Sequence, residues 1–240
     1  SGVHTCAVPT CVVLVPELSR RLQAGEDTQG RQALNRAAEL ALFLTLPAAV
    51  ALIAVPLPLV SVLFERGRFG ADDAAATAMA VAIYGLGLPA FVMQKVLQPL
   101  YFAREDTRTP FRYALVAMVV NAVLAVALAP VIGFLAAAIG TTLASWAMVV
   151  LLWHGSRAMG DAARLDARFM QRAARIGLAS LGMGGVLLAV HALLGAMFAA
   201  GGWRYLALAL LVGAGMISYL VISRMLGAFR PSELRAAMRR

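Results

Sequence analysis

Few side chains within the long apolar stretches of this sequence can do chemistry, and Lys95 is the most unusual of them. It lies eight residues before Ala103, where its apolar stretch ends, so about 12 Å of helix separates it from that end. A charged side chain at this depth in a membrane is costly and usually faces a bundle interior or a water-filled path. There, a buried ammonium group would suit an anionic ligand such as a phosphate headgroup. The competing interpretation is that the flexible lysine stem carries its charge back to the interface, and we favour the first.

No other group of side chains forms a recognisable catalytic site. His4, His154 and His191 have no carboxylate or nucleophile at a useful spacing, which argues against Ser-His-Asp and metal-hydrolase chemistry. Cys6 and Cys11 are the two cysteines and have no second ligand cluster, so we expect no metal site. The sequence also lacks a Gly-rich phosphate loop ending in Gly-Lys-Ser/Thr. We therefore predict a protein that is not an enzyme and uses no cofactor.

Asn121 and Thr141 are a second polar pair within apolar sequence. They lie in consecutive apolar runs, so they can face each other as a hydrogen bond between two helices, which is the interpretation we favour. They can also be regarded as weak cation-binding candidates. A cation site of this kind needs a carboxylate, and Ala122, Ala125 and Ala138 around them offer none.

The composition identifies the surroundings of these residues as a lipid bilayer. Hydrophobic residues make up 61% of the 240 residues, and charged ones 14%, against about 25% in ordinary soluble proteins. The net charge of +9 is compatible in principle with nucleic-acid binding. The basic residues, however, fall in short clusters between long charge-free runs, which is typical of membrane topology. We expect an integral membrane protein whose partners are lipids and not nucleic acids.

The elements that must position Lys95 are transmembrane helices, each of which needs about 20 mostly apolar residues. The run at 113–156 is too long for one crossing, and residues 130–133, from Pro130 to Gly133, supply a turn that divides it. A shorter apolar piece at residues 7–15 resembles the end of a further helix. The sequence thus predicts an all-α, polytopic transmembrane helix bundle with six full spans plus the end of a truncated seventh. The full spans are residues 40–64, 74–103, the two parts of 113–156, 176–203 and 205–223.

The arginines predict the orientation of these spans. When the connections are assigned alternately to the two sides of the membrane, 17 arginines fall on one side and 3 on the other. Because positive residues concentrate on the cytoplasmic side, the first side is predicted to be cytoplasmic, together with the C-terminus. The three arginines on the other side are Arg66, Arg68 and Arg204.

Other features of the spans are less specific. Prolines within them free backbone carbonyls and can line a transporter cavity, although proline is generally frequent in membrane helices. Residues 161–175 and 231–240 have the spacing of helices that lie on an anionic leaflet, and the second segment is equally consistent with a solvated loop. The prolines are Pro47, Pro56, Pro58, Pro89 and Pro99.

Three motifs carry a resemblance to a known family. Residues 14–20 (LVPELSR), 63–69 (LFERGRF) and 95–110 (KVLQPLYFAREDTRTP) resemble successive landmarks of the MurJ/MviN family. These are bacterial lipid II flippases of the multidrug/oligosaccharidyl-lipid/polysaccharide exporter superfamily. The resemblance extends from about residue 14 onward. It departs from the family at residues 3–12, which contain His4, Cys6, Pro9 and Cys11 where the family has a smooth apolar helix.

This resemblance implies a function and a division of the chain. It implies fourteen helices in the whole protein, of which this chain is the C-terminal half, and a missing N-terminal lobe as its partner. Residues 1–34 would be the end of a truncated helix and a cytoplasmic loop. Residues 35–159 would be the four-helix part of the C-terminal lobe, and residues 160–240 the final hairpin with an interfacial segment and a cytoplasmic tail.

The expected function is translocation of the peptidoglycan precursor lipid II across the bacterial inner membrane by alternating access. Of the family's central-cavity features, only Lys95 transfers to this sequence within its matching motif. Asn121 and Thr141 fall at plausible positions for the family's sodium site, whose carboxylate is missing. The alternatives are a multidrug or polysaccharide exporter of the same superfamily, an integral membrane enzyme, and a structural helical subunit.

Overall fold

The computed structural model describes residues 27–157, 166–199 and 203–227, and every regular element in these ranges is an α-helix. Six of these helices are long and apolar enough to cross a membrane, which confirms the predicted all-α fold and its six full spans. The truncated seventh span predicted at residues 7–15 lies outside the described residues. The helices are α2 (Asp27–Ala54), α3 (Pro56–Phe64), α4 (Ala71–Phe102), α5 (Arg108–Ile132), α6 (Leu135–Arg157), α7 (Ala167–Leu193), α8 (Gly195–Ala199) and α9 (Arg204–Met225).

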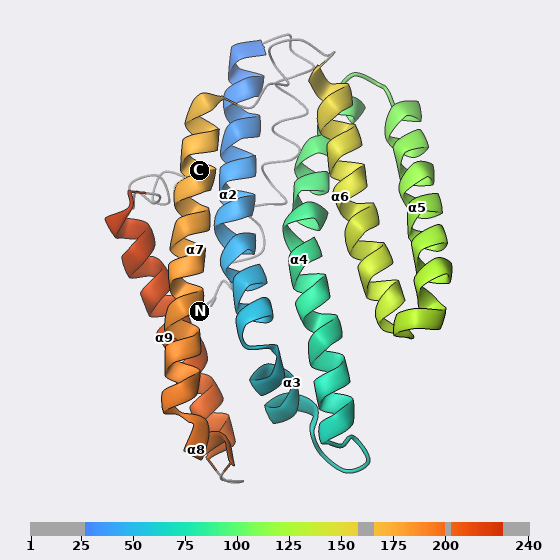
Figure 1. Ribbon diagram of the computed structural model, residues 1–240. Helices are drawn as coiled ribbons and strands as arrows, with labels where there is room; N and C mark the ends of the chain where they lie inside the picture. The colour runs from blue at the N-terminus through green and yellow to red at the C-terminus, as the bar shows by residue number, and fades with distance from the viewer. Residues whose placement is uncertain (1–26, 158–165, 200–202, 228–240) are drawn as a thin grey trace, which may run out of the picture.

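The six long helices stand side by side in one row, in the order α9, α7, α2, α4, α6 and α5 (Figure 1). This order differs from the chain order because α4 packs beside α6, and α5 packs on the outer side of α6. Among the described helices the row is one long helix thick, so a long helix inside it has long neighbours on two flanks and none on the other two sides. The described chain thus forms an open layer and not a closed bundle.

Glycines allow the neighbouring helices of the row to approach closely. A Cβ atom added at any of five glycines would lie between 2.7 and 3.2 Å from an atom of the next helix, closer than ordinary van der Waals contact. Small residues are favoured at such interfaces because packing in lipid depends on close backbone approach. The glycines are Gly85 (against α2), Gly87 (against α6), Gly140 (against α5), Gly184 (against α2) and Gly215 (against α7).

The first predicted span, residues 40–64, starts too late and is not one continuous helix, although its predicted end, Phe64, is the end of α3. The helix begins at Asp27 and stops at Ala54, and a second short helix, α3, starts at Pro56. Pro56 and Pro58 have no N–H to continue the hydrogen bonds of α2, and the first turn of a helix is the place where proline is tolerated. Val55, between the helices, is non-helical at φ −133° and ψ 50°.

Two further boundaries differ from the predicted ones. Helix α5 continues through Pro130 to Ile132, and the turn to α6 is made by Gly133, whose φ of +59° favours glycine. The described part of the predicted interfacial segment, from Ala167 to Arg175, is the beginning of α7 and not a separate surface helix. Phe169 in this part is 4% exposed and packs in the core, because the apolar side of the segment faces α2.

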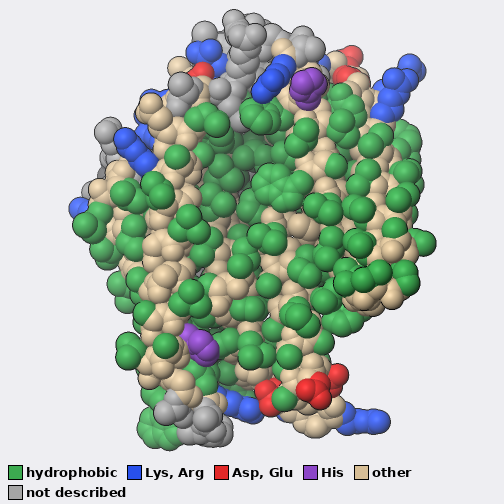
Figure 2. Space-filling model, viewed as in Figure 1, with side chains coloured by type: hydrophobic (Ala, Val, Ile, Leu, Met, Phe, Trp, Pro, Cys, Tyr) green, Lys and Arg blue, Asp and Glu red, His purple; other side chains and the backbone are tan. Residues whose placement is uncertain are grey.

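Charged side chains gather at the two ends of the layer (Figure 2). We call the end that holds the α4–α5 turn the arginine-rich end, because ten of the thirteen described arginines lie there. The other end, which holds the α3–α4 loop and the start of α9, is the arginine-poor end, with Arg66, Arg68 and Arg204. The ten are Arg31, Arg36, Arg104, Arg108, Arg112, Arg157, Arg168, Arg172, Arg175 and Arg224.

Candidate functional site

Lys95 lies on an uncovered side of α4, towards the arginine-rich end. It precedes Phe102, the last residue of α4, by seven residues, or about 10 Å of helix. Its side chain is exposed. Leu86, nine residues earlier, is 54% exposed, and nine residues are two and a half helical turns. Lys95 and Leu86 therefore point to opposite sides of the layer, and the charge occupies one side only.

A stripe of residues runs along α4 on the same side as Lys95. Residues separated by 7, 11 or 18 positions share a face of an α-helix, because these numbers are close to whole turns of 3.6 residues. Leu88, Tyr84 and Thr77 have these spacings from Lys95. We call this set, together with Asp73, the α4 stripe. It is uncharged between Lys95 and Asp73, over most of the length of the helix.

Four hydrogen bonds hold α4 in register with α6. The Gln94 amide donates to Ser145 O at 2.9 Å, and the Tyr101 hydroxyl donates to Leu152 O at 2.6 Å. In the other direction, Thr142 Oγ1 donates to Ile83 O and Trp146 Nε1 donates to Leu86 O, both at 3.0 Å. Polar contacts between membrane helices fix rotation and register as well as distance. They therefore fix which residues of α4 remain on the uncovered side.

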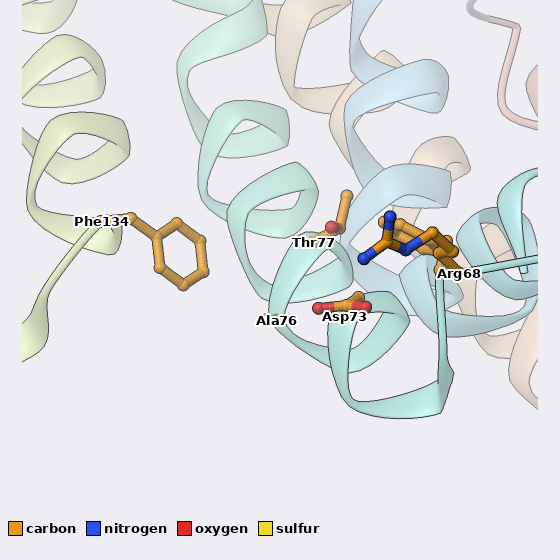
Figure 3. A pocket seen from close by; sticks show the side chains of 6 residues that line it. Arg68, Asp73, Ala76, Thr77 and Phe134 are labelled. Carbon is orange, nitrogen blue, oxygen red and sulfur yellow. The ribbon is translucent and has the colours of Figure 1, made fainter.

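At the arginine-poor end, the α4 stripe terminates in a shallow, open pocket of about 510 Å³ (Figure 3). The guanidinium of Arg68 lies over Asp73 and Thr77, and Phe134 from the α5–α6 turn stands on the far side. We call this cavity the Arg68 pocket. Its lining residues are Arg68, Phe69, Asp73, Ala76, Thr77 and Phe134.

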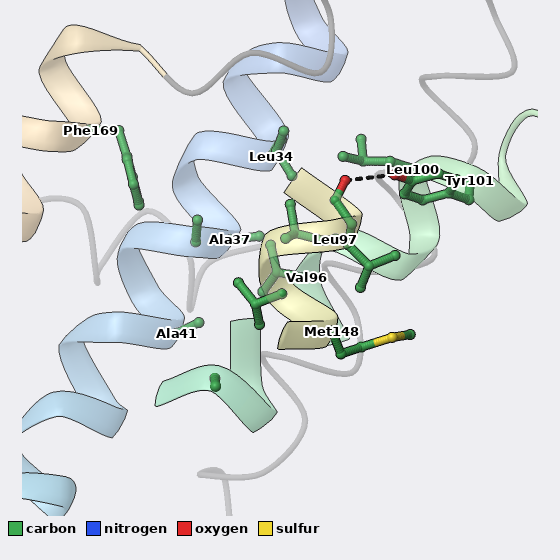
Figure 4. Packing of buried hydrophobic residues seen from close by; sticks show 13 residues of the cluster. Leu34, Ala37, Ala41, Val96, Leu97, Leu100, Tyr101, Met148 and Phe169 are labelled. Atoms are coloured by element: carbon green, nitrogen blue, oxygen red, sulfur yellow. Dashed lines mark hydrogen bonds between the residues drawn. The ribbon is translucent and has the colours of Figure 1, made fainter. Parts of the chain in front are cut away.

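At the arginine-rich end, an apolar cluster supports the segment that carries Lys95 (Figure 4). Val96 and Leu97, which directly follow Lys95, are 6% and 1% exposed. They pack with residues of α2, α6 and α7, so Lys95 is held at the edge of a tightly packed region. The labelled members of this cluster are Leu34, Ala37, Ala41, Val96, Leu97, Leu100, Tyr101, Met148 and Phe169.

The structure explains the end of the 95–110 motif as a helix-to-helix turn. The amide of Asp106 donates to Tyr101 O at 3.1 Å and that of Glu105 to Phe102 O at 3.0 Å, the two bonds of a Schellman motif. Glu105 has a φ of +57°, where glycine is usual. Asp106 Oδ1 then accepts the amide of Thr109 at 3.0 Å in the first turn of α5. Hydrogen bonds from the Thr109 side chain and backbone hold the pKa of Asp106 below its ordinary value.

Asn121 and Thr141 do not form the predicted hydrogen bond with each other. Thr141 Oγ1 donates to Ala137 O of its own helix at 2.8 Å. Asn121 faces Gly140 instead, where an added Cβ would lie 2.8 Å from Asn121 Oδ1. The two side chains are one residue out of register, which a spacing argument cannot resolve. The assignment of Asn121 and Thr141 as weak cation-binding residues stays a prediction.

The residues of the Arg68 pocket do not belong to any site predicted from the sequence. Arg68 lies in one of the three motifs and contributes to the predicted orientation, whereas Asp73 and Thr77 belong to no predicted site. The available signal was the spacing of 18 residues between Thr77 and Lys95, which is five helical turns and places both on one stripe.

Comparison with known proteins identifies the group to which this architecture belongs. Residues 3–212 match the family described as "Lipid II flippase MurJ". A "Probable lipid II flippase MurJ" from Rhizobium meliloti (strain 1021) is 38% identical over 242 residues, covering 100% of this chain and 45% of that protein. The protein of the same description from Vibrio cholerae serotype O1 is 32% identical over 237 residues, covering 98% of this chain and 44% of that protein.

A solved structure shares the fold. The structure described as "Lipid II flippase MurJ, inward closed conformation" superimposes with a TM-score of 0.72 at 24% identity, over 91% of this chain and 42% of that one. The chain thus spans less than half the length of these relatives. Because the family match extends over most of the chain, from residue 3 to residue 212, the chain belongs to the lipid II flippase MurJ family.

Proposed function

We propose that this chain is one lobe of a transporter that moves lipid II across the bacterial inner membrane. The observation that carries the proposal is the family match over residues 3–212. The open layer supports it, because a lobe with an uncovered face leaves room for a second lobe, and two-lobe transporters bind substrate between their halves. The second lobe would correspond to the part of the relatives that this chain does not cover.

In this proposal the substrate headgroup meets Lys95. Lipid II carries its sugars on an undecaprenyl diphosphate, so the group next to the lipid tail is anionic. A lysine on the uncovered side of α4 attracts such a group, and an aqueous cavity between two lobes would solvate the lysine when no substrate is bound. Rocking of the two lobes would then expose the cavity to one side of the membrane at a time, without an ATP-binding site.

The lipid tail would run along the hairpin of α7 and α9, the main part of the proposed 160–240 unit. Both helices have large apolar side chains that are more than half exposed, such as Leu181 at 66% and Ile217 at 66%. Residues 35–159 would then form the cavity-facing unit. Asn121 and Thr141 would be weak cation-binding positions at its outer edge, on α5 and α6.

The orientation follows from the charges. With ten described arginines at one end of the layer and three at the other, the positive-inside rule favours the arginine-rich end as the cytoplasmic one. Helix α9 ends there at Met225, so the C-terminus would be cytoplasmic. Anionic phospholipids of the inner leaflet would be the neighbours of this end.

The test is complementation of a bacterium whose own lipid II flippase is depleted. A chimera joins the part of the Rhizobium meliloti relative that precedes the matched region to this chain. We expect the chimera to sustain growth and this chain alone not to, because one lobe cannot enclose a cavity. Failure of a chimera present at normal abundance would contradict the proposal. Export of drug cations without lipid II transport would favour the exporter alternative.

A further inference from the structure

The Arg68 pocket and Lys95 lie at opposite ends of one stripe of α4. Thr77 and Lys95 are 18 residues apart, which corresponds to about 27 Å along a helix, so they lie towards opposite ends of the 32-residue helix α4. Charge is absent from the stripe between Lys95 and Asp73. A polar group moving along this side of the lobe therefore meets polar side chains towards the arginine-rich end of α4 and again towards its arginine-poor end.

We propose that the Arg68 pocket is a second substrate subsite, which holds the sugar portion of the headgroup at the arginine-poor side of the membrane. This inference rests on the proposed function, and it adds a site and a ligand class to it. The pocket's volume of about 510 Å³ lies within the range of about 300–1,000 Å³ that is usual for small-ligand sites. It is open, as a site that receives and releases a large amphiphile must be.

The Arg68 guanidinium is available to a ligand. The neighbouring Arg66 uses its guanidinium to donate to Leu63 O at 2.7 Å. Arg68 instead lies over the pocket, and it makes no hydrogen bond or ion pair with any residue of the described ranges. Its side chain is exposed, so it reaches the pocket without a desolvation cost.

The charge balance of the pocket selects neutral polar groups over a diphosphate. Asp73 contributes one negative charge beside the single positive charge of Arg68. Asp73 Oδ2 accepts the backbone amide of Gly70 at 3.1 Å, which leaves Oδ1 for a ligand. A guanidinium donor, a carboxylate acceptor and the Thr77 hydroxyl, which does both, match sugar hydroxyl and acetamido groups. A diphosphate would be repelled by the carboxylate.

Two aromatic rings complete the fit to a sugar. Phe134 is 60% exposed, and Phe69, which packs against the cluster of Val60, Ala74 and Ala78, also lines the pocket. Binding sites for small polar ligands combine an apolar wall with a few directed polar groups, and the C–H face of a pyranose ring is apolar. Lys95 and the Arg68 pocket therefore differ in chemistry: Lys95 suits the diphosphate, and the Arg68 pocket suits the saccharide.

The test measures protection of the pocket from a thiol reagent. The chain carries Ala76→Cys, with Cys6 and Cys11 replaced by serine, in membranes opened so that the reagent reaches both faces. The probes are di-N-acetylchitobiose and inorganic pyrophosphate. At a concentration ten times its Kd, the disaccharide should slow maleimide labelling about tenfold, because only the unoccupied pocket reacts. Pyrophosphate should not slow it.

Matched variants make the result specific to the pocket. Arg68→Ala and the nearly isosteric Thr77→Val should each abolish protection by the disaccharide, whereas Arg66→Ala should retain it. Equal protection by pyrophosphate, no protection by the disaccharide, or protection that survives Arg68→Ala would each overturn the subsite. Labelling does not depend on transport. If the chimera supports growth but the disaccharide does not protect the pocket, the subsite is refuted and the proposed function is not. If the chimera fails but the disaccharide protects the pocket, the proposed function is refuted and the binding of the saccharide is not.

Discussion

The hydroxyl group of Tyr219 in α9 donates a hydrogen bond of 2.7 Å to the carbonyl oxygen of Phe43 in α2. In an uninterrupted helix this carbonyl would accept the amide of residue 47, but that residue is Pro47, which has no N–H. Backbone groups without a partner are costly at membrane depth. The tyrosine thus replaces, from another helix, the bond that the proline removes, and the two aromatic rings pack with centroids 5.1 Å apart.

Tyr219→Phe should destabilise the protein by about 0.5–1.5 kcal/mol, because it removes the hydrogen bond to the Phe43 carbonyl while keeping the ring. The measurement is unfolding in mixed micelles of increasing denaturing detergent. In a Pro47→Ala background, where an amide can serve the carbonyl, the same substitution should cost less. The control is Tyr205→Phe, at an exposed ring that starts α9, which should have little effect. An equal cost of Tyr219→Phe in both backgrounds would refute the role assigned to the proline.

Glu105→Gly should stabilise the α4–α5 turn by about 0.5–1 kcal/mol. Glu105 adopts a φ of +57°, a conformation that costs residues with a Cβ about 1–2 kcal/mol and glycine almost nothing. The larger freedom of glycine in the unfolded chain offsets part of this gain. Arg104→Gly, one residue earlier and without a positive φ, should destabilise the protein in the same unfolding measurement. A destabilising effect of both substitutions would contradict the expectation.

Two adjacent glycines should respond in opposite ways to alanine. A Cβ at Gly184 would lie 2.7 Å from Val50 Cγ1 of α2, a stiff β-branched neighbour, whereas a Cβ at Gly185 would meet nothing within 4 Å. We expect Gly184→Ala to destabilise the packing of α7 on α2 by about 1–3 kcal/mol, as overpacking does. Gly185→Ala should be neutral or stabilising, by up to about 1 kcal/mol. Thermal aggregation midpoints of the two purified variants make the comparison, and equal shifts would show that this contact does not limit the approach of the helices.

The arginine distribution predicts the accessibility of the loops. Single cysteines at Arg66 and near Gly201 should react with an impermeant maleimide added to intact cells, because both loops are expected on the periplasmic side. Cysteines at Arg104 and Arg164 should react only after permeabilisation. Arg66→Cys and Arg104→Cys form the most direct pair, since both side chains are exposed at opposite ends of the layer. Labelling in the reverse order would invert the proposed orientation.

Removal of the charge at Lys95 should impair transport by the chimera about tenfold or more. A hydrogen bond to a charged group is worth about 1.5–3 kcal/mol, and about 1.4 kcal/mol corresponds to a factor of ten. Lys95→Ala should lose most activity, and Lys95→Arg, which keeps the charge with a different shape, should keep part of it. Growth of the flippase-depleted host is measured at matched membrane abundance. Full complementation by Lys95→Ala would leave Lys95 as an interfacial anchor.

The spans could be predicted from the sequence because charge-free length is a local property, and the charge clusters between them predicted the two ends of the layer. The neighbours of each helix could not be predicted in this way. Nothing in the run at 113–156 indicates that its second half packs beside α4, a contact that depends on Gly87 and on the bonds of Thr142 and Trp146 to α4.

The sequence pattern also could not predict which side chains of neighbouring helices contact each other. The expected pairing of Asn121 with Thr141 failed by a single residue, because a hydropathy run leaves the rotation of a helix about its axis undetermined. The Val55 break was also missed, since Pro56 and Pro58 can either kink a helix or end it. The exposed side of Lys95 and the Arg68 pocket depend on the same rotation.

The position of α6 between α4 and α5 has a consequence for biogenesis. Among the described helices, α5 packs almost entirely on α6, which follows it in the chain. Until α6 is inserted, α5 therefore lacks its main neighbour, and it has the highest mean hydropathy of the six spans, 2.6, with none of its 18-residue apolar window buried. Insertion of α6 then connects α4 and α5. Gly87 makes the close contact between α4 and α6, and Gly140 makes the close contact between α6 and α5. Synthesis of α6 is thus the step at which this half of the layer acquires its register.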